Sequence, residues 1–237
     1  SGLYSTAMGY NTDASGSRST AMGSYTDATG NNSTAMGSST DATGNNSTAM
    51  GSSTDASGYN STAMGSNTTA SGSRSTAMGS NTTASGDNST AMGSLTTASG
   101  LYSTAMGSGT TAQSYTETTI GRYNTTYGGN TQTWISSDRL FVVGNGNSPN
   151  ARSDAMVILK NGNTGIGNST PTHRLDVSGQ VRMRTGATNG YIVQGDANGV
   201  MSWVNPSTLG LGGGTLDDAY DQGGPGAGRS IDATDGA

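Results

Sequence analysis

The sequence predicts an all-β protein whose first half is a parallel β-roll, or β-solenoid, built from 14-residue coils. The phrase Ser-Thr-Ala-Met-Gly recurs eight times at a constant interval of fourteen residues, first at 5–9 and last at 103–107. A second phrase, Thr-x-Ala-x-Gly, follows seven of these copies, so a glycine closes each half of the repeat. Two short strands and two tight turns per repeat are the pattern of one solenoid coil.

Side chains alternate within Ser-Thr-Ala-Met-Gly, as a strand requires. In the first copy Thr6 and Met8 share one face, whereas Ser5 and Ala7 share the other. A helix is disfavoured, because each phrase ends in glycine after five residues and Ser, Thr and Asn fill the rest. Methionine is the largest apolar side chain of the invariant columns. We therefore predict that one packed column consists of Met8, Met22, Met36, Met50, Met64, Met78, Met92 and Met106.

Other columns vary from copy to copy, which predicts that they lie outside. The side chains there that are best suited to contact a partner are aromatic or carry a guanidinium. They are Tyr10, Arg18, Tyr25, Tyr59 and Arg74. A tolerant surface without a binding role is the competing interpretation for each of them.

Apolar bulk is scarce in this chain. Leu, Ile, Val and Phe together account for 24 of 237 residues. Burying one Met per coil contributes about 1.5–3 kcal/mol, whereas ordering the backbone costs about 1–2 kcal/mol per residue. Ladder hydrogen bonds offset part of this cost, but a second buried face is needed. The sequence therefore predicts that several copies pack side by side.

Charge and composition exclude several other classes. The net charge is −5 and the ten cations are scattered, so a nucleic-acid partner is not expected. No cysteine is present, which excludes disulfides and thiolate metal sites. No apolar run approaches the ~20 residues of a membrane-spanning helix. The sequence begins in mid-repeat, so we expect any export signal and membrane anchor to lie outside it.

The stretch NSTAMGSNTTASG at 60–72 resembles the head repeat of YadA-type trimeric autotransporter adhesins, whose phrase is S-x-A-Φ-G. The resemblance covers residues 1–121 and ends in a decayed ninth unit at Ile120 and Gly121. It implies a left-handed parallel β-roll, a homotrimeric head and an extracellular location. It also implies attachment to a host cell, the matrix, a glycan or an abiotic surface.

The second half reads as two further segments. Residues 122–209 carry short strand-like runs, with turn dipeptides at Asn161-Gly162 and Ser178-Gly179 and a hairpin at 190–206 that turns at Asp196–Gly199. This segment resembles those that follow such heads in bacterial surface fibres and phage tail fibres. Residues 210–237 are rich in glycine and are expected to link to a further segment.

No constellation of residues predicts catalysis, a cofactor or a metal. The stretch GGPGAGRS at 223–230 resembles a phosphate-binding loop, but it lacks the lysine and the strand–helix context. His173 is the only histidine and has no identifiable catalytic partners. The column Asp13, Asp27, Asp41 and Asp55 either binds a cation or is a row of solvated carboxylates, and the sequence leaves this open.

The function we predict is attachment by a non-enzymatic fibre. Three alternatives remain: a tail fibre of a phage or a contractile injection system, a spacer that only adds length, and an ice-binding solenoid. The ice-binding hypothesis depends on the threonine columns that start at Thr6 and Thr12 forming two exposed ladders side by side.

Overall fold

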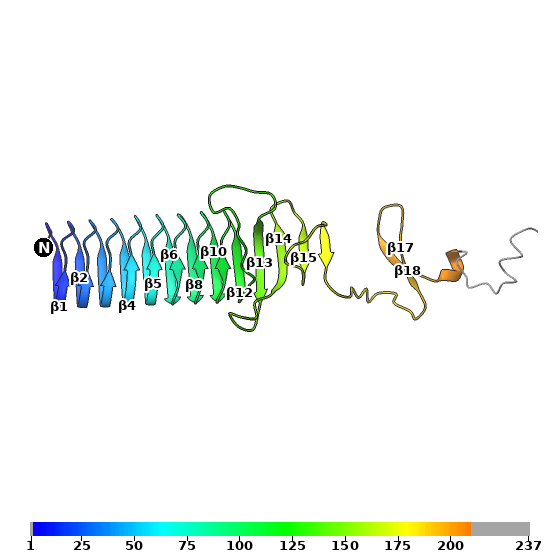
Figure 1. The fold of residues 1–237 in the computed structure, drawn as a ribbon, viewed down its shortest axis with the longest axis horizontal. Coiled ribbons are helices and arrows are strands. Elements are labelled where there is room, and N and C mark those ends of the chain that lie inside the picture. Colours follow the sequence, from blue (N-terminus) through cyan, green and yellow to red (C-terminus); the bar gives the residue numbers. More distant parts are fainter. Residues whose placement is uncertain (1, 210–237) are drawn as a thin grey trace, which may run out of the picture. The chain divides into compact units, whose positions relative to one another are not determined.

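The repeats stack as successive coils in the computed structural model, which describes residues 2–209 (Figure 1). Chain contacts divide the protein into two compact units at Gln180 and Val181. The first unit contains a 16-stranded sheet that runs from β1 to β16. The linker expected at 210–237, which includes the GGPGAGRS stretch, lies outside the described residues.

The repeat region contributes the first twelve strands. They are β1 (Thr6–Asp13), β2 (Thr20–Asp27), β3 (Thr34–Asp41), β4 (Thr48–Ala56), β5 (Thr62–Ala70), β6 (Thr76–Ser80), β7 (Thr83–Ala84), β8 (Thr90–Ser94), β9 (Thr97–Ala98), β10 (Thr104–Ser108), β11 (Thr111–Ala112) and β12 (Thr118–Arg122). The first five strands span both phrases of a repeat. From the sixth coil onward the two phrases form separate strands, as β6 and β7 do.

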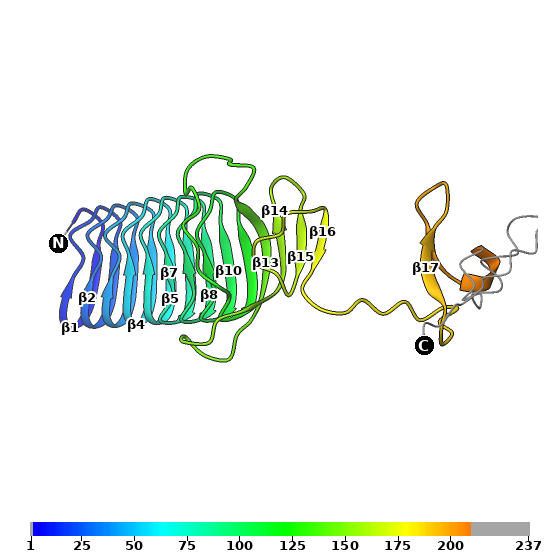
Figure 2. The same cartoon turned by 45° about the vertical axis from the view of Figure 1, so that its right-hand side comes forward.

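Equivalent residues pair between neighbouring coils, because each coil advances the chain by fourteen residues. Met8 lies opposite Met22, and Ala7 lies opposite Ala21. The same parallel register reaches the decayed unit, where Met106 lies opposite Ile120. The turned view shows the coils following one another along the stack (Figure 2). The predicted all-β fold with a parallel solenoid of 14-residue coils is confirmed.

Small side chains fill the inside of the coils. In the fourth coil the interior is made by Ser47, Ala49, Thr54 and Ala56, each at most 1% exposed. The methionines lie on the other face of the strand, and Met8 is 58% exposed. Because only Ala, Ser and Thr fit between the two layers of so narrow a coil, the larger side chain faces outward.

The prediction that the methionine column packs inside the coil is therefore wrong for the single chain. The alternation itself was predicted correctly, but the assignment of the two faces was reversed. The column comprises Met8, Met22, Met36, Met50, Met64, Met78, Met92 and Met106, all of them partly or largely exposed.

Glycine and left-handed corners allow the coils to stack closely. Gly51 has φ +129°, and a Cβ placed on it would lie 2.0 Å from the carbonyl oxygen of Gly65 in the next coil. Each coil also turns at two residues in the left-handed region, seven positions apart, such as Asn46 (φ 57°) and Ser53 (φ 54°). These corners are where the variable columns of the sequence lie.

The stack ends in a partly antiparallel segment. β13 (Arg139–Asn145) continues the parallel ladder from β12, whereas β14 (Asp154–Leu159) and β15 (Thr164–Ile166) pair antiparallel. β16 (Leu175–Val177) then pairs parallel with β15. The predicted Asn161-Gly162 turn joins β14 to β15, with Gly162 at φ +87°. A small apolar core of Val142, Val157 and Leu159 supports this segment.

The second unit contains the predicted hairpin, formed by β17 (Ile192–Gly195) and β18 (Met201–Val204), and a short 3-10 turn (Pro206–Leu209). The carboxylate of Asp196 accepts the backbone N–H groups of Asn198 and Val200, which fixes the expected turn. A strand was also expected directly after Ser178-Gly179, but residues 180–191 form none. Within residues 2–209 no helix has the length and hydropathy to cross a membrane.

Candidate binding surface

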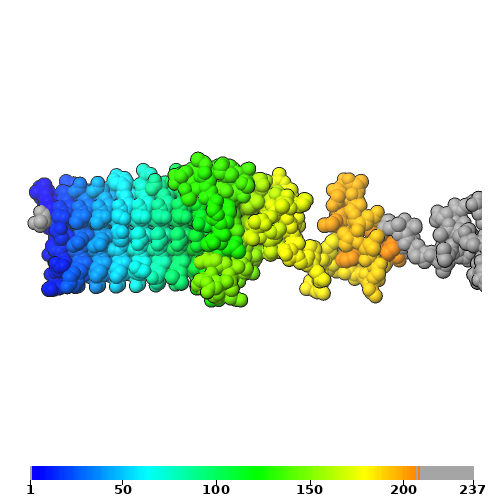
Figure 3. All heavy atoms as spheres, viewed as in Figure 1, coloured from blue at the N-terminus to red at the C-terminus, as the bar shows by residue number. Residues whose placement is uncertain are grey.

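The outer surface of the roll presents the same positions once per coil, so that its side chains form rows (Figure 3). Residues in the left-handed corners project outward, and asparagine is common there because it tolerates positive φ. Some of these side chains pair along the row: Asn32 Nδ2 donates to Asn46 Oδ1 at 3.1 Å, and Asn67 Nδ2 donates to Asn81 Oδ1 at 2.6 Å. The rows are therefore partly held by hydrogen bonds before any partner binds.

The five predicted contact residues do not form one patch. Tyr10 and Tyr25 lie at one corner of the coil, where their rings make an edge-to-face contact at 5.4 Å. Arg18, Tyr59 and Arg74 lie at or beside the other corner, seven positions away. All five are exposed. The structure thus offers two separate edges, each with an aromatic group.

The aspartate column is a row of like charges on the outside of the roll. Asp27 lies directly opposite Asp41, which in turn lies opposite Asp55. Partial burial, and then the charges of Asp27 and Asp55, raise the pKa of Asp41. A shallow depression of about 250 Å³ beside the row is lined by Asn11, Tyr25, Asp27, Ser39 and Asp41.

Metal-ligand geometry is not found in that row. Among residues 2–209 no group of three or more His, Cys, Asp or Glu side chains converges as a metal site would. The row presents its carboxylates side by side along the ladder rather than around one point. It is therefore a surface of negative potential, beside a tyrosine.

The threonine columns do not form an ice-binding face. Thr26, Thr40, Thr54, Thr68, Thr82, Thr96 and Thr110 are buried inside the coils. The other column, which begins with Thr6, shares the outer face with the methionines. Two exposed threonine ladders side by side are thus absent from the described coils.

The C-terminal edge of the roll is closed by side chains that replace a further coil. Asn124 Oδ1 accepts the N–H of Thr111 at 2.8 Å, and Asn124 Nδ2 donates to the carbonyl of Thr111 at 3.0 Å. Glu117, which stands where earlier repeats have the buried serine, accepts N–H groups from Gln113 and Ser114. These contacts satisfy backbone groups that would otherwise form an open sheet edge.

Charged residues gather behind this cap. Arg139 is 4% exposed, lies 3.3 Å from Asp154 and donates to the carbonyl of Thr125 at 2.6 Å. Lys160 lies 3.8 Å from Asp138 and faces the rings of Tyr115 and Trp134. No pattern in the sequence predicted this cluster. The feature that could have indicated a buried charge is Lys160, the only lysine of the chain, because it directly follows the apolar run Val157–Leu159.

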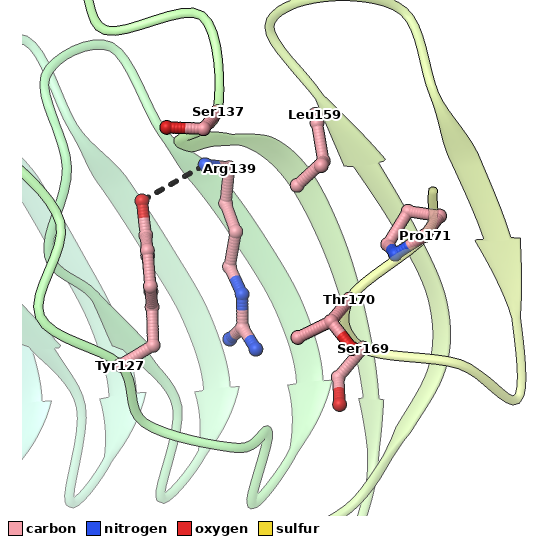
Figure 4. Close-up of a pocket in the computed structure, with 7 residues that line it drawn as sticks. All are labelled: Tyr127, Ser137, Arg139, Leu159, Ser169, Thr170 and Pro171. Carbon is pink, nitrogen blue, oxygen red and sulfur yellow. Dashed lines mark hydrogen bonds between the residues drawn. The ribbon is translucent and has the colours of Figure 1, made fainter. Parts of the chain in front are cut away.

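A pocket of about 250 Å³ opens beside the cluster (Figure 4). Tyr127 and Arg139 line one side, and Leu159, Thr170 and Pro171 line the other. The Tyr127 hydroxyl accepts the backbone N–H of Arg139 at 2.9 Å, and burial raises the pKa of Tyr127 to about 12. The phenol therefore stays protonated, and Arg139 is already paired. The lining offers no activated nucleophile.

His173 lies on the surface and not in this pocket. Its Nδ1 is 2.9 Å from the hydroxyl of Thr172, and the Asp176 carboxylate accepts from that same hydroxyl at 3.2 Å. Thr172 and His173 precede β16, and Asp176 lies within it. The arrangement is a local turn network around an exposed histidine.

Comparison with known proteins agrees with the coil geometry. The YadA head domain repeat family matches residues 1–26, 28–54, 56–82 and 84–110. The sequence of residues 1–110 thus matches YadA head domain repeats. Each matched segment covers about two coils, and the described strands lie in register with the repeat. No curated protein matches the chain.

Proposed function

We propose that this chain is part of a fibrous, non-enzymatic surface adhesin that acts outside the cell as a homotrimer. The observation that carries the proposal is the uninterrupted run of YadA head domain repeats over residues 1–110. The buried interior of the coils, made of Ala, Ser and Thr, contains no catalytic constellation. The chemistry available for function therefore lies on the outer faces.

Self-association is supported by the face that carries the threonine column from Thr6 and the methionine column from Met8, here called the methionine face. Its methionines are partly or largely exposed in the single chain, although they are the largest apolar side chains of the invariant columns of the repeat. Covering a fully exposed methionine contributes about 1.5–3 kcal/mol, and covering a partly exposed one contributes less. Three copies that pack through this face would bury eight such side chains per chain.

Attachment is supported by the corner rows. Each row repeats a weak contact along the roll, and three chains multiply the number of rows. Simultaneous contacts raise apparent affinity without any single deep pocket. Two edges with exposed tyrosines, and arginines at one of them, suit such contacts to a host cell, matrix protein, glycan or abiotic surface.

The test compares the whole chain with a variant that lacks residues 31–72, which are three coils and leave the repeat in register. Both proteins are coated on beads, and retention under flow is measured on cells, matrix proteins, glycans and bare plastic. We expect the shortened protein to keep its β-sheet circular dichroism and to bind less. If neither protein adheres to any surface, the coils act as a spacer and the adhesion proposal is wrong.

A further inference from the structure

Lys160 is the only lysine of the chain, and its side chain is buried although the residue as a whole is partly exposed. Its side chain has no exposed surface, and its Nζ has no hydrogen-bond partner. Lysine is almost never fully buried unless it is paired. Here the group that pairs with the buried amine is the carboxylate of Asp138, 3.8 Å away.

Asp138 is held against this amine by the sheet. β13 and β14 pair antiparallel, with Arg139 opposite Leu159, so Asp138 and Lys160 are the next residues along the two strands. The N–H of Lys160 donates to the carbonyl of Asp138 at 2.8 Å. Asp138 is 6% exposed, and its Oδ2 lies 3.8 Å from Lys160 Nζ.

The surroundings of this pair are aromatic and acidic. Lys160 Nζ lies 5.7 Å from the ring centroid of Tyr115 and 5.3 Å from that of Trp134. Burial lowers the pKa of Lys160, while the charges of Asp138 and Glu117 oppose that shift. Burial likewise raises the pKa of Glu117, which is 1% exposed. Such a site favours the neutral amine that nucleophilic attack requires.

From this juxtaposition we propose that Lys160 and Asp138 join in an intramolecular amide bond. The ammonium first passes a proton to the carboxylate, which leaves a neutral amine beside a carboxylic acid. The amine nitrogen attacks Cγ of Asp138 and forms the N–C bond, and the C–O bond to the hydroxyl then breaks. The hydroxyl leaves with a second proton from nitrogen as one water molecule, and no oxidant or other reactant is needed.

The position of the bond gives it a mechanical role. It would tie β13 to β14 where the sheet changes from parallel to antiparallel. A fibre that is pulled along its axis would be loaded at this junction, and a chain without cysteine has no disulfide with which to secure it. An amine and a carboxyl group that the fold already holds side by side react more readily than free groups, because no further translational freedom is lost when they meet.

The experiment is the intact mass of the purified full chain, followed by tryptic mapping. We expect a mass lower than that of the sequence by one water molecule. Trypsin should fail to cleave after Lys160, and the digest should contain residues 123–139 joined to residues 153–174. Fragmentation of that branched peptide should place the link on Asp138 and Lys160.

The matched control is Lys160→Arg, which keeps the positive charge but lacks the primary amine. It should show the full mass of its own sequence. A wild-type protein at full mass after prolonged incubation in the folded state would overturn the proposal and leave a buried ion pair. A water loss mapped to any other pair of residues would overturn it equally.

Discussion

Ala49 and Met50 are neighbours in β4, yet Ala49 is fully buried inside the coil and Met50 lies on its outer face. The alternation of the strand produces this opposition, and it recurs in the coils from Ala21 and Met22 to Ala105 and Met106. The smaller residue stabilises the single chain, whereas the larger one stays partly exposed on the face through which we propose that the copies meet.

Substituting the inner residue should therefore damage the coil itself. Ala49→Asp places a carboxylate at a position that is closed to solvent, and we expect it to cost about 3 kcal/mol or more. The control is Asn46→Asp, at an exposed corner that tolerates aspartate, which should change stability by less than about 0.5 kcal/mol. Thermal unfolding followed by circular dichroism compares the two, and equal melting temperatures would contradict the assignment of inside and outside.

Substituting the outer residue should affect assembly instead. Met50→Asp puts a charge on the methionine face, where copies of the chain are proposed to meet, and we expect the trimer to dissociate into folded monomers. Analytical ultracentrifugation measures the mass, and circular dichroism confirms that the β structure persists. A variant that remains a trimer of wild-type stability would argue against this face as the interface.

The stacked glycines should not accept a side chain. In Gly51→Ala the new Cβ would meet the carbonyl oxygen of Gly65 at 2.0 Å, in a backbone conformation that L-residues rarely adopt. We expect a loss on the order of 3 kcal/mol. The adjacent exposed Ser52→Ala is the control and should shift the denaturant midpoint little. A fully tolerated alanine at position 51 would mean that the coils stack less closely.

Substituting a buried threonine with valine should increase stability rather than reduce it. Thr54 Oγ1 is enclosed and has no hydrogen-bond partner among the described residues. Thr54→Val keeps the volume and removes the unpaired hydroxyl, so we expect a gain of about 1 kcal/mol. Thr54→Ala leaves a small cavity and should lose about 1 kcal/mol. A valine variant that is less stable than wild type would show that the hydroxyl has a partner in solution.

The aspartate row predicts greater stability in mild acid. Burial, with repulsion from Asp27 and Asp55, raises the folded-state pKa of Asp41 above its unfolded value near 3.8. The folded state then holds the proton more tightly, so this contribution is fully present below the unfolded pKa and is lost as pH rises through the folded pKa. Melting temperatures measured from about pH 4 to about pH 7 should fall less in Asp41→Asn than in wild type. Identical slopes would mean that the carboxylates are screened from one another.

Much of this architecture could be predicted from the repeat alone. A strict period of fourteen residues determines one coil per copy and places equal residues opposite each other, as Met8 and Met22 are. Alternation correctly grouped Thr6 with Met8 and separated them from Ala7. The Asn161-Gly162 turn and the turn at Asp196–Gly199 were also readable, because their residues favour those conformations locally.

Which face of the strand points inward was decided only by the tertiary structure. Burial depends on how closely the two layers of a coil approach, and that distance admits Ala49 but not Met50. The cap at the C-terminal edge of the roll could not be predicted from the sequence either, because it also depends on the packing of distant segments. Lys160 meets Asp138, and Asn124 completes the edge at Thr111, through contacts between residues distant in the chain. Local pattern determines the strands and their period, whereas the packing of distant segments determines what each face of a strand meets.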